Sequence, residues 1–468
     1  MKISVIGAGY VGLTTAACLA EIGHIVRCAD NDERKLALLR GGEMPFFEPH
    51  LEEIVLRNSS AGRLRFDSVE DAVMDAPAIF ICVGTPPLEN GEADLSAVAN
   101  VARIIGQHAS GDCLVIEKST VPVQTGQQLK RQLDLYGDKA LRCEVASNPE
   151  FLREGTAIQD FFHPDRIVIG AESEEAAARL REIYRPILEQ TFKCPAHSNC
   201  TLSRKPAWLM TDMCSAELIK HASNSFLATK VSFINMVADL CELVGADVTK
   251  VALGMGMDPR IGPAFLSAGI GYGGFCLPKD VQAFSRLAAK AGCDLSLLRE
   301  VERVNTNRIE HFLDKIRQEL WVIRGRKIAV LGLAFKPNTD DIRFAPAIEL
   351  IRAIVREGAT VSVYDPEAMN KAKSVLPDVR YCADAYDAAN SAEAIILATE
   401  WPEFKNLDWE ELRRIVERPL VVDGRNMFTP EEMTSHGFHY VSTGRQPTFC
   451  IDQVLPAALA QESQVVLK

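Results

Sequence analysis

The fold of this chain is decided by its first residues, which include the stretch Lys2-Ile3-Ser4-Val5-Ile6-Gly7-Ala8-Gly9-Tyr10-Val11-Gly12. The apolar run is typical of a buried strand, the motif G-x-G-x-x-G follows it, and a helical pattern continues through Ala20. A second strand, from His24 to Ala29, ends at Asp30. Glycines at positions 7, 9 and 12 permit a tight turn and let the backbone approach a pyrophosphate. The pattern predicts a βαβ unit that binds a dinucleotide, and a glycine-rich turn without a ligand is the weaker interpretation.

Asp30 indicates which dinucleotide is bound. It follows the glycines by about the twenty residues that separate the two features in such units. Its carboxylate can accept hydrogen bonds from both ribose hydroxyls and would repel a 2′-phosphate. The sequence therefore predicts NAD rather than NADP as the cofactor.

Three further predicted strands end at polar turns. Residues 78–83 run into Gly84-Thr85-Pro86-Pro87, residues 113–118 into Ser119-Thr120-Val121-Pro122, and residues 143–147 into Asn148-Pro149-Glu150. Ligands of open parallel α/β sheets bind beyond the carboxyl ends of the strands, so these turns are expected to meet at one crevice. Considered alone, Thr85 and Thr120 fit turn or capping positions equally well.

One long helix is predicted from about Cys214 to Val244, with Thr211 or Asp212 as its cap. Thirty residues of helix span roughly 45 Å, so we expect this helix to join two domains and to form a subunit contact. Lys220 and Asn224 lie four residues apart and share a face. That face is equally compatible with a solvated stripe.

A cysteine lies within the stretch Gly269-Ile270-Gly271-Tyr272-Gly273-Gly274-Phe275-Cys276-Leu277-Pro278-Lys279-Asp280. The glycines let a ligand approach the backbone, and Pro278 suits the first turn of a helix. A helix start and the charge of Lys279 are expected to favour the thiolate of Cys276. Most cysteines are inert and buried, but these neighbours favour a reactive nucleophile here.

The opening pattern returns later in the chain. Lys327-Ile328-Ala329-Val330-Leu331-Gly332 resembles residues 2–7, and the strand-like residues 360–364 end at Asp365. Leu333-Ala334-Phe335-Lys336-Pro337 replaces the second and third glycines, so we expect a second dinucleotide-type fold without a second NAD. Lys336 and Arg343 offer positive charge to phosphates or to a sugar.

The stretch Cys194-Pro195-Ala196-His197-Ser198-Asn199-Cys200 contains three potential zinc ligands, and Cys214 is a distant fourth. Zinc sites usually have more closely paired ligands. We therefore interpret this stretch as a surface insertion and expect no metal site.

Composition limits the class of protein. The 468 residues suggest two or three domains, and 47% hydrophobic and 24% charged residues are ordinary for a soluble protein. A formal net charge of -12 argues against nucleic-acid binding, and no apolar run is long enough for a membrane span. Thirteen cysteines without framework spacing, and no visible export signal, predict a cytoplasmic location.

Taken together, these motifs resemble the UDP-glucose/GDP-mannose dehydrogenase family over nearly the whole chain. The matching stretches are the opening fingerprint, residues 117–122, 147–155, 215–235 and 260–266, the Cys276 loop, residues 335–337 and residues 341–343. The resemblance implies an α/β fold with two Rossmann-like doubly wound domains joined by a long central helix and a helical region. The expected domains are residues 1–205 for NAD, 206–318 for dimerisation and the active site, and 319–468 for the UDP-sugar.

The resemblance also implies an activity. Such enzymes oxidise the C6 hydroxyl of a nucleotide-linked hexose to a carboxylate and reduce two NAD for each sugar. The leading substrate is UDP-glucose, which gives UDP-glucuronate for polysaccharide biosynthesis. Oxidation of GDP-mannose or of a UDP-N-acetylhexosamine is the close alternative. A module that binds NAD and a nucleotide sugar without catalysis is the alternative of another class. A homodimer or higher homo-oligomer is expected.

By the same resemblance, Cys276 captures the aldehyde intermediate as a thiohemiacetal, which becomes a thioester. Lys220 and Asn224 stabilise the oxyanion, Asp280 and Thr120 hold a water and assist proton transfer, and Glu150 is the base for hydrolysis. The expected cofactor contacts are Gly7, Gly9, Tyr10, Val11, Gly12, Asp30, Lys35, Thr85, Thr120, Glu154, Lys279 and Arg343. The expected substrate contacts are Glu150, Phe151, Leu152, Arg153, Glu154, Lys220, Asn224, Arg260, Phe265, Leu266, Ser267, Ala268, Gly269, Gly273 and Lys336.

This sequence departs from the usual family pattern in places. Phe275 stands before the nucleophile where the family commonly has serine, and His221 stands where it has tyrosine. Residues 190–206 read as an insertion. None of these departures removes a catalytic group, although Phe275 is expected to narrow the pocket.

Overall fold

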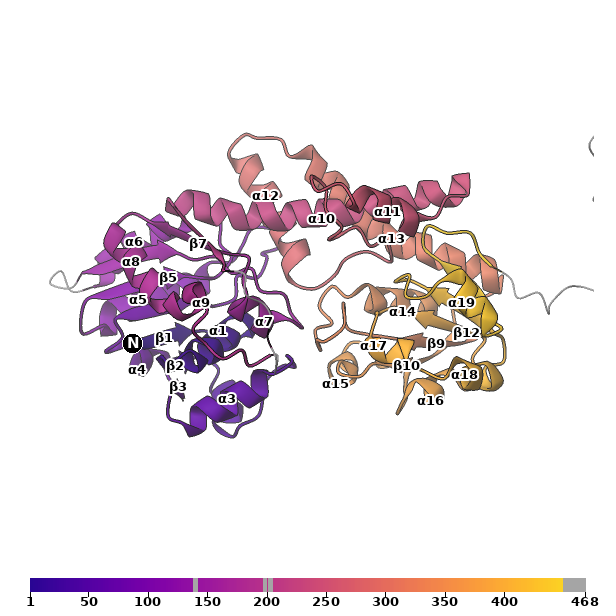
Figure 1. Cartoon of the computed structure of the whole chain (residues 1–468), viewed down its shortest axis with the longest axis horizontal. Helices are drawn as coiled ribbons and strands as arrows, with labels where there is room; N and C mark the ends of the chain where they lie inside the picture. Colours follow the sequence, from indigo (N-terminus) through magenta and orange to yellow (C-terminus); the bar gives the residue numbers. More distant parts are fainter. Residues whose placement is uncertain (138–141, 197–199, 201–204, 449–468) are drawn as a thin grey trace, which may run out of the picture. The chain divides into compact units, whose positions relative to one another are not determined.

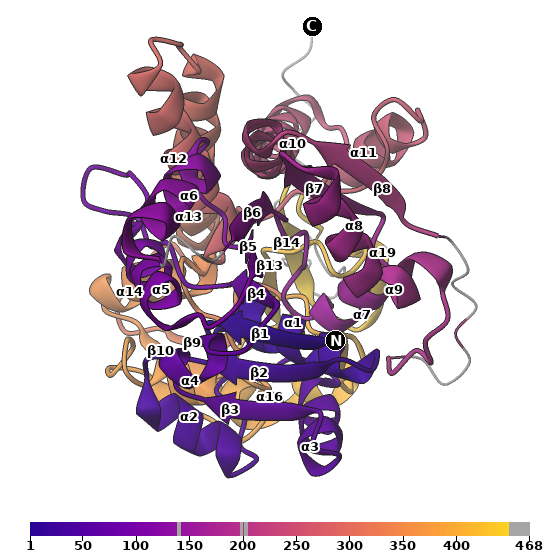
Figure 2. The same ribbon diagram turned by 90° about the vertical axis from the view of Figure 1, so that its left-hand side faces the viewer.

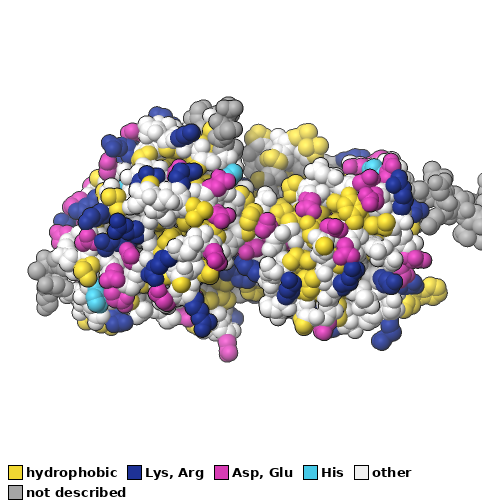
Figure 3. All heavy atoms as spheres, turned by 90° about the horizontal axis from the view of Figure 1, so that it is seen from below, with side chains coloured by type: hydrophobic (Ala, Val, Ile, Leu, Met, Phe, Trp, Pro, Cys, Tyr) yellow, Lys and Arg dark blue, Asp and Glu magenta, His cyan; other side chains and the backbone are white. Residues whose placement is uncertain are grey.

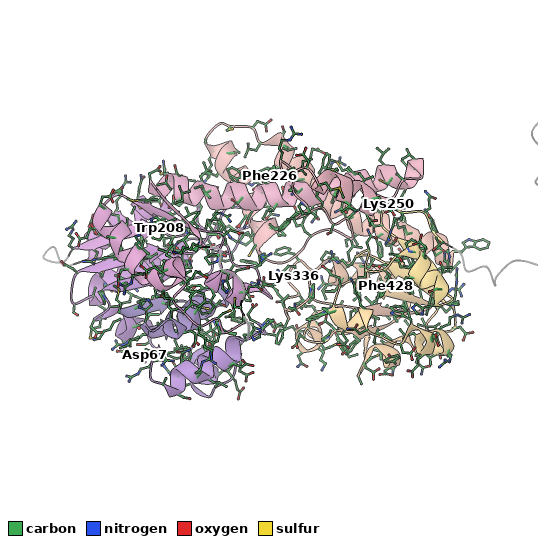
Figure 4. All side chains as sticks on the ribbon, viewed as in Figure 1. Asp67, Trp208, Phe226, Lys250, Lys336 and Phe428 are labelled. Carbon is green, nitrogen blue, oxygen red and sulfur yellow. The ribbon has the colours of Figure 1, made fainter. Side chains whose placement is uncertain are left out.

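The structure is a computed structural model that describes residues 1–137, 142–196, 200 and 205–448 (Figure 1). The chain divides into two compact units. The first contains Met1–Phe226 and Cys276–Arg299, and the second contains Leu227–Phe275 and the chain from Glu300 onward. Phe226, labelled in Figure 4, lies on helix α10 (Met213–Val244), so this helix contributes residues to both units.

The first unit is built on an eight-stranded sheet with the order β3-β2-β1-β4-β5-β6-β7-β8. Neighbouring strands are parallel except at β6–β7, which is antiparallel. The strands are β1 (Lys2–Ile6), β2 (Ile25–Ala29), β3 (Leu64–Asp67), β4 (Ala78–Ile81), β5 (Cys113–Glu117), β6 (Cys143–Ser147), β7 (Arg166–Ala171) and β8 (Ala207–Thr211). Because β1, β4, β5 and β6 run in the same direction, the turns after them reach one edge of the sheet, as the sequence predicts.

Helices cover both faces of this sheet, as in a doubly wound fold (Figure 2). One buried cluster places Leu13 of α1, Phe162 of α7 and Leu180 of α8 on one face, and another places Ile105 of α5 and Leu133 of α6 on the other. The helices of this unit are α1 (Tyr10–Glu21), α2 (Glu33–Arg40), α3 (Leu51–Ser60), α4 (Val69–Val73), α5 (Ser96–His108), α6 (Thr125–Tyr136), α7 (Ala157–Phe162), α8 (Glu174–Ile183), α9 (Arg185–Glu189) and α12 (Cys276–Lys290).

The fingerprint glycines have different reasons to be glycine. Gly7 has a φ of 105°, and a Cβ there would lie 2.6 Å from the carbonyl oxygen of Cys82. A Cβ on Gly12 would lie 1.7 Å from the carbonyl oxygen of Gly7. A Cβ on Gly9 would meet no atom of the described chain within 4 Å. The chain itself therefore requires Gly7 and Gly12, whereas Gly9 leaves open space at the start of α1.

The second unit contains a six-stranded parallel sheet with the order β11-β10-β9-β12-β13-β14. Its strands are β9 (Lys327–Leu331), β10 (Thr360–Tyr364), β11 (Arg380–Tyr381), β12 (Ala394–Leu397), β13 (Leu420–Asp423) and β14 (His439–Ser442). Its helices are α11 (Val248–Gly256), α14 (Pro346–Arg356), α15 (Met369–Ala372), α16 (Ala385–Ala389), α17 (Pro402–Lys405), α18 (Trp409–Ile415) and α19 (Pro430–Ser435), and α13 (Ser296–Leu320) enters it at Glu300. The second Rossmann-like fold predicted from Lys327 onward is confirmed.

Helix α10 is the long helix that the sequence predicts. Its 32 residues begin after Asp212, whose carboxylate accepts a hydrogen bond from the backbone N–H of Ser215 at 2.8 Å. In the second unit, Ile234, Ala238 and Cys241 of α10 belong to one buried cluster with Val248 and Leu266. This packing stabilises the second half of the helix, because an isolated helix in water gains little from propensity alone.

The surface is that of a protein with mixed charges. Acidic and basic side chains are interspersed on the face drawn in Figure 3. Among the described residues, no helix combines the length and the apolar character that crossing a membrane requires.

Candidate active site

Cys276 is the first residue of α12, and it lies in the first unit. Lys279 and Asp280 follow it within one helical turn, and both are buried. Pro278, which the sequence places in the first turn of a helix, is the third residue of α12. The thiol therefore shares its surroundings with two ionisable side chains of the same turn.

Lys220 of α10 and Glu150, which follows β6, form a buried ion pair. The Lys220 Nζ to Glu150 Oε1 distance is 2.8 Å, and the two side chains are only 5% and 4% exposed. Burial opposes the charge on Lys220, but Glu150, Asp280 and Cys276 together raise the pKa of the lysine above its ordinary value. The ammonium group is therefore held in its charged form beside the thiol.

Asn224, one turn along α10, is linked to the start of α12. Its Nδ2 donates a hydrogen bond to Asp280 Oδ2 at 2.5 Å, and Lys279 Nζ lies 2.8 Å from Asp280 Oδ1. Lys279 also donates to Thr85 Oγ1 at 3.4 Å, and Thr85 Oγ1 donates to the carbonyl oxygen of Thr120 at 2.8 Å. Burial would raise the pKa of Asp280, but Lys279 and Lys220 lower it below the usual range. Asp280 is thus an ionised acceptor at the centre of this network.

These contacts decide two questions that the sequence left open. Lys220 and Asn224 do lie on one face of α10, but that face is buried and is no solvated stripe. Thr85 contributes its hydroxyl group to the network, whereas Thr120 contributes its backbone carbonyl group.

The protonation state expected for Cys276 is wrong. Burial raises the pKa of its thiol to about 12, Glu150 adds to the rise, and Lys220 opposes it. The start of a helix favours a thiolate, but desolvation and nearby carboxylates outweigh that effect here. The thiol must therefore lose its proton as part of any reaction, and Lys220 is the cation that favours this loss.

At the same edge of the sheet, the turns that follow β1 and β2 fit a dinucleotide. Asp30 follows β2, and its carboxylate accepts hydrogen bonds from the backbone N–H of Ala8 at 2.7 Å and from Lys35 Nζ at 2.9 Å. Burial opposes this charge, but those hydrogen bonds lower the pKa of Asp30. Gly9 caps α1 without a side-chain hydrogen bond, and the first turn contains no acidic residue. The open space at Gly9 and the positive end of α1 suit a pyrophosphate, while ionised Asp30 suits a ribose.

The loop from Glu150 to Glu154 follows β6 at the same edge of the sheet. The backbone N–H of Leu152 donates to Glu150 Oε2 at 2.5 Å, which fixes the other oxygen of the carboxylate that pairs with Lys220. The ring of Phe151 lies under the guanidinium group of Arg166 at 3.8 Å and near Lys220 Nζ at 5.4 Å. Arg153 pairs with Asp160. The loop is thus rigidly held, and Glu154 is buried at its end.

Glu48 is a residue of this site that sequence reasoning missed. Its carboxylate accepts hydrogen bonds from Tyr10 Oη, from the backbone N–H of Gly155 at 2.6 Å and from that of Ala157 at 2.7 Å. It therefore joins the fingerprint helix to the end of the Glu150 loop. No local pattern marks Glu48, because its partners are 38 and more than 100 residues away.

Lys118 is a second missed residue, although it lies in one of the stretches that carry the family resemblance. Its Nζ donates to Asn148 Oδ1 at 3.2 Å and to Tyr184 Oη at 3.4 Å. Burial lowers the pKa of Lys118 to about 8, and Glu150 partly offsets this. A lysine at the end of an apolar strand is the signal that marks it, because lysine is seldom fully buried without a role.

The other expected site residues belong to the second unit. Arg260 is exposed and paired with Asp258. The segment 265–269 contains Phe265 in the left-handed region, with a φ of 64°, and the backbone N–H of Gly269 donates to Asn235 Oδ1 at 2.9 Å. Lys336, labelled in Figure 4, lies on the loop that follows β9.

Arg343 and Gly273 are also in the second unit. The Arg343 guanidinium group pairs with Asp341 and lies 4.5 Å from the ring centre of Phe275. A Cβ on Gly273 would lie 2.3 Å from the carbonyl oxygen of Phe344. Phe275 thus has an aromatic contact of its own within the second unit.

In the second Rossmann-like fold, the carboxylate that corresponds to Asp30 has different surroundings. Asp365, which follows β10, is 1% exposed. Its Oδ2 accepts hydrogen bonds from the backbone N–H groups of Leu333 and Ala334 at 2.7 and 3.0 Å and from Trp401 Nε1 at 3.0 Å. Its Oδ1 accepts from the N–H groups of the next turn. This carboxylate is used entirely by its own unit.

The chain matches three domain profiles of the UDP-glucose/GDP-mannose dehydrogenase family. They are the NAD binding domain over residues 1–188, the central domain over residues 214–307 and the UDP binding domain over residues 329–430. The fold and the two sheet edges agree with the order of these domains.

Similar proteins carry names of the same family. UDP-glucose 6-dehydrogenase TuaD of Bacillus subtilis is 43% identical over 95% of this chain and 93% of its own length. The UDP-glucose 6-dehydrogenase of Rhizobium meliloti is 45% identical over 95% of this chain and all of its own length. Among solved structures, a UDP-glucose dehydrogenase from Pyrobaculum islandicum has a TM-score of 0.82 at 41% identity, covering 91% of this chain and 94% of that one.

Proposed function

The chain belongs to the UDP-glucose/GDP-mannose dehydrogenase family, and we propose that it oxidises UDP-glucose to UDP-glucuronate with NAD as the oxidant. Relatives named for UDP-glucose are 40–45% identical to it, whereas a UDP-D-ManNAc dehydrogenase structure from Pyrococcus horikoshii is 28% identical. The observation that carries the proposal is the placement of Cys276 beside the Lys220–Glu150 pair and the Asn224–Asp280 contact. A binding module without catalysis has no need of these buried charges.

The chemistry requires a nucleophile because an aldehyde has no hydride that can leave until its carbon becomes tetrahedral. NAD⁺ held at Gly9, Asp30 and Lys35 would supply the oxidising power, one molecule for the C6 alcohol and a second molecule for the tetrahedral adduct. Cys276 loses its proton and its sulfur bonds to the aldehyde carbon, which gives a thiohemiacetal. Lys220 and Asn224 then stabilise the negative oxygen, one by charge and the other by its N–H group.

Hydrolysis completes the reaction. The oxidised adduct is a thioester of Cys276, and water attacks its carbonyl carbon. Glu150 accepts a proton from that water, the carbon–sulfur bond breaks, and the sulfur leaves as a thiolate. Asp280 assists proton transfer, and Thr120 supports the same network through its backbone carbonyl group, which accepts a hydrogen bond from Thr85. In total, one alcohol, two NAD⁺ and one water give one carboxylate, two NADH and three protons.

We also assign the contacts of the ligands by position. The cofactor is placed at Gly9, Asp30 and Lys35, where open space and charge suit it. The UDP-sugar is placed at Glu150–Glu154, Arg260, residues 265–269, Gly273 and Lys336. The need for a reduced Cys276, together with thirteen cysteines of unpatterned spacing, supports a cytoplasmic location.

A homodimer is the proposed assembly. In the second unit, α10 exposes Phe233, Met236, Leu240 and Leu243, which are 46%, 47%, 57% and 84% exposed. Their spacings of three, four and seven residues place them along one side of the helix, as in helices that pair. Light scattering on the purified chain would give twice the mass of 51.4 kDa, and Leu240→Glu would reduce it to the mass of the monomer.

The test of the activity is a stoichiometry. Purified protein is incubated with UDP-glucose, GDP-mannose or a UDP-N-acetylhexosamine, and NADH and remaining sugar are both measured. We expect about two NADH for each UDP-glucose consumed, and turnover with UDP-glucose alone. If no sugar nucleotide gave NADH, a binding module would be favoured. If another sugar nucleotide were turned over faster, that sugar would take the place of UDP-glucose as the proposed substrate.

The covalent step has its own test. Cys276→Ser should reduce turnover by about a thousandfold or more, because a hydroxyl group is a far weaker nucleophile than a thiolate. In Glu150→Gln, mass spectrometry during turnover should find the sugar attached to the Cys276 peptide. Normal turnover in Cys276→Ser would reject the covalent mechanism and leave the overall reaction intact.

A further inference from the structure

A cluster of two cysteines and one histidine lies in the first unit, outside the network around Cys276. His163 directly follows α7, and Cys194 and Cys200 lie in the segment between α9 and β8, where both thiols contact the imidazole ring of His163. The ligand atoms of the three side chains all lie within 4.8 Å of one another, and all three side chains are partly buried. His197, which the sequence analysis also considered, lies outside the described residues.

The distances within the cluster are those of ligands that share an ion. Cys194 Sγ and Cys200 Sγ each lie 3.3 Å from the same atom, His163 Nε2. A neutral imidazole nitrogen has one proton or one lone pair, so it cannot form good hydrogen bonds with both thiols at once. Tetrahedral zinc with ordinary bond lengths places a sulfur and a nitrogen ligand about 3.5 Å apart. A shared metal therefore explains both contacts together.

We propose that His163, Cys194 and Cys200 bind a zinc ion. Thiolate and imidazole ligands select zinc among the common metals of the cell, and two thiolates neutralise its charge of +2. Binding releases two protons from the two thiols and leaves His163 neutral. The fourth position is taken by water or by another side chain. Because no step oxidises or reduces the ion, the site needs no co-reactant.

The sequence analysis expected no metal here because it sought four ligands in one stretch and found only a distant Cys214. His163 lies 31 residues before Cys194, and only the folding of α7 against the later segment brings them together. Spacing within the stretch Cys194–Cys200 alone could not reveal this partner. The expectation therefore rested on an incomplete ligand set.

The surroundings indicate a structural role. The ring of Phe192 lies 5.0 Å from that of Phe162 and 5.5 Å from that of His163, and Phe162 belongs to the buried core of the first unit. The zinc ion would fasten the segment after α9 to the end of α7. The start of α7 is held by Glu48 through the backbone N–H of Ala157. Zinc would thus stabilise the framework of the Glu150 loop from its far end.

The test uses the full chain without a metal-binding tag, expressed with zinc and dialysed against buffer. Mass spectrometry of the metals should find about one zinc for each chain. The double variant Cys194→Ser/Cys200→Ser should lose it, and so should His163→Ala. Cys214→Ser and Cys293→Ser make the same chemical change at two cysteines outside the cluster and should keep it. The double variant should also lower Tm by about 5 °C.

A second measurement needs no variant and covers the case in which the variants do not fold. A mercurial reagent added to the folded wild type should release zinc in step with the modification of two thiols. Peptide mapping should then find Cys194 and Cys200 modified. Wild-type protein without metal, zinc retained by the double variant, or a disulfide between Cys194 and Cys200 would each overturn the proposal. None of these outcomes depends on the proposed activity.

Discussion

The two sheets of this protein begin with the same strand–turn–helix pattern and use its carboxylate differently. Asp30 follows the second strand of one sheet and accepts three hydrogen bonds, from Lys35 and from the backbone N–H groups of Ala8 and Asp32. Asp365 occupies the same place in the other sheet and accepts five hydrogen bonds from its own unit. The Asp30 side chain keeps a small exposed fraction, and we propose that it contacts the cofactor, whereas Asp365 is fully buried in the core of its unit. The comparison teaches that a repeated fold motif carries a repeated function only where its polar groups are left to a ligand.

The largest effect that would test this difference is on stability. Asp365→Ala should lower the free energy of unfolding by about 3–5 kcal/mol, because it leaves several buried donors without an acceptor. Urea denaturation measures the change, and Asp365→Asn should cost less since it keeps one oxygen acceptor. The KM for NAD should stay within about twofold of wild type. A large rise in that KM would show that Asp365 has a ligand role after all.

The next effect concerns two glycines. Gly332 is the first glycine of the turn after β9 in the second unit, and Gly9 is the middle glycine of the turn after β1 in the first unit. Gly332→Ala should destabilise the protein by about 3 kcal/mol, since Gly332 has a φ of 99° and a Cβ there would lie 2.4 Å from Thr399 Cβ. Gly9→Ala should change stability by less than about 0.5 kcal/mol and weaken NAD binding at least about tenfold, because its methyl group enters the open space.

Thermal unfolding and NAD titration of both glycine variants test whether Gly332→Ala loses stability and Gly9→Ala loses NAD affinity. An unfolding defect in Gly9→Ala with normal NAD affinity would remove the main argument for placing the pyrophosphate there.

Asp30→Ala should affect NAD binding rather than stability, whereas Asp365→Ala should affect stability rather than NAD binding. We expect NAD binding to weaken by about 10- to 100-fold, which corresponds to the loss of hydrogen bonds to a charged group, with stability nearly unchanged. Isothermal titration with NAD and with NADP measures the affinity and the loss of discrimination. Lys35→Ala is the control, because it removes the partner of Asp30 and leaves the carboxylate in place. If Asp30→Ala bound NAD normally, the distinction between the two sheets would fail.

The smallest effect concerns the thiol of the first unit. Because burial raises the pKa of Cys276 to about 12, its thiolate fraction, and hence its alkylation rate, should rise about tenfold for each pH unit between pH 8 and 10. Iodoacetamide labelling followed by peptide mass spectrometry measures this rate, and UDP-glucose should slow it. Cys382, a buried cysteine of the second unit, should remain unlabelled in the folded protein. If the labelling rate of Cys276 stopped rising below pH 9, the thiol would already be largely ionised there, and the raised pKa would be wrong.

Much of the fold could be predicted from local sequence. β1, β6 and β10 have the predicted bounds, and β2, β4 and β5 differ by one or two residues, because apolar runs with polar ends fix buried strands closely. The helix expected from Cys214 begins at Met213, where Asp212 caps it. The antiparallel step between β6 and β7 could not be predicted, since strand direction there depends on tertiary packing.

The site was only partly predictable for the same reason. Lys220, Asn224 and Asp280 were found because they lie near each other in sequence or in a known motif. Glu48 and His163 were missed because each acts through partners that only the fold brings near. The protonation of Cys276 was mispredicted because helix position can be read from sequence, whereas desolvation cannot.

Glu48 also restricts how the protein can evolve. A single carboxylate holds the hydroxyl group of Tyr10 and two backbone amides of the segment that follows Glu154. Replacement of that tyrosine by phenylalanine would remove one donor from the carboxylate and one acceptor from the backbone N–H of Gly155, and loss of the acid would leave the Tyr10 hydroxyl group and the backbone N–H of Ala157 without this acceptor. Positions 10 and 48 should therefore change together across related sequences, although 37 residues lie between them and neither touches the reactive sulfur.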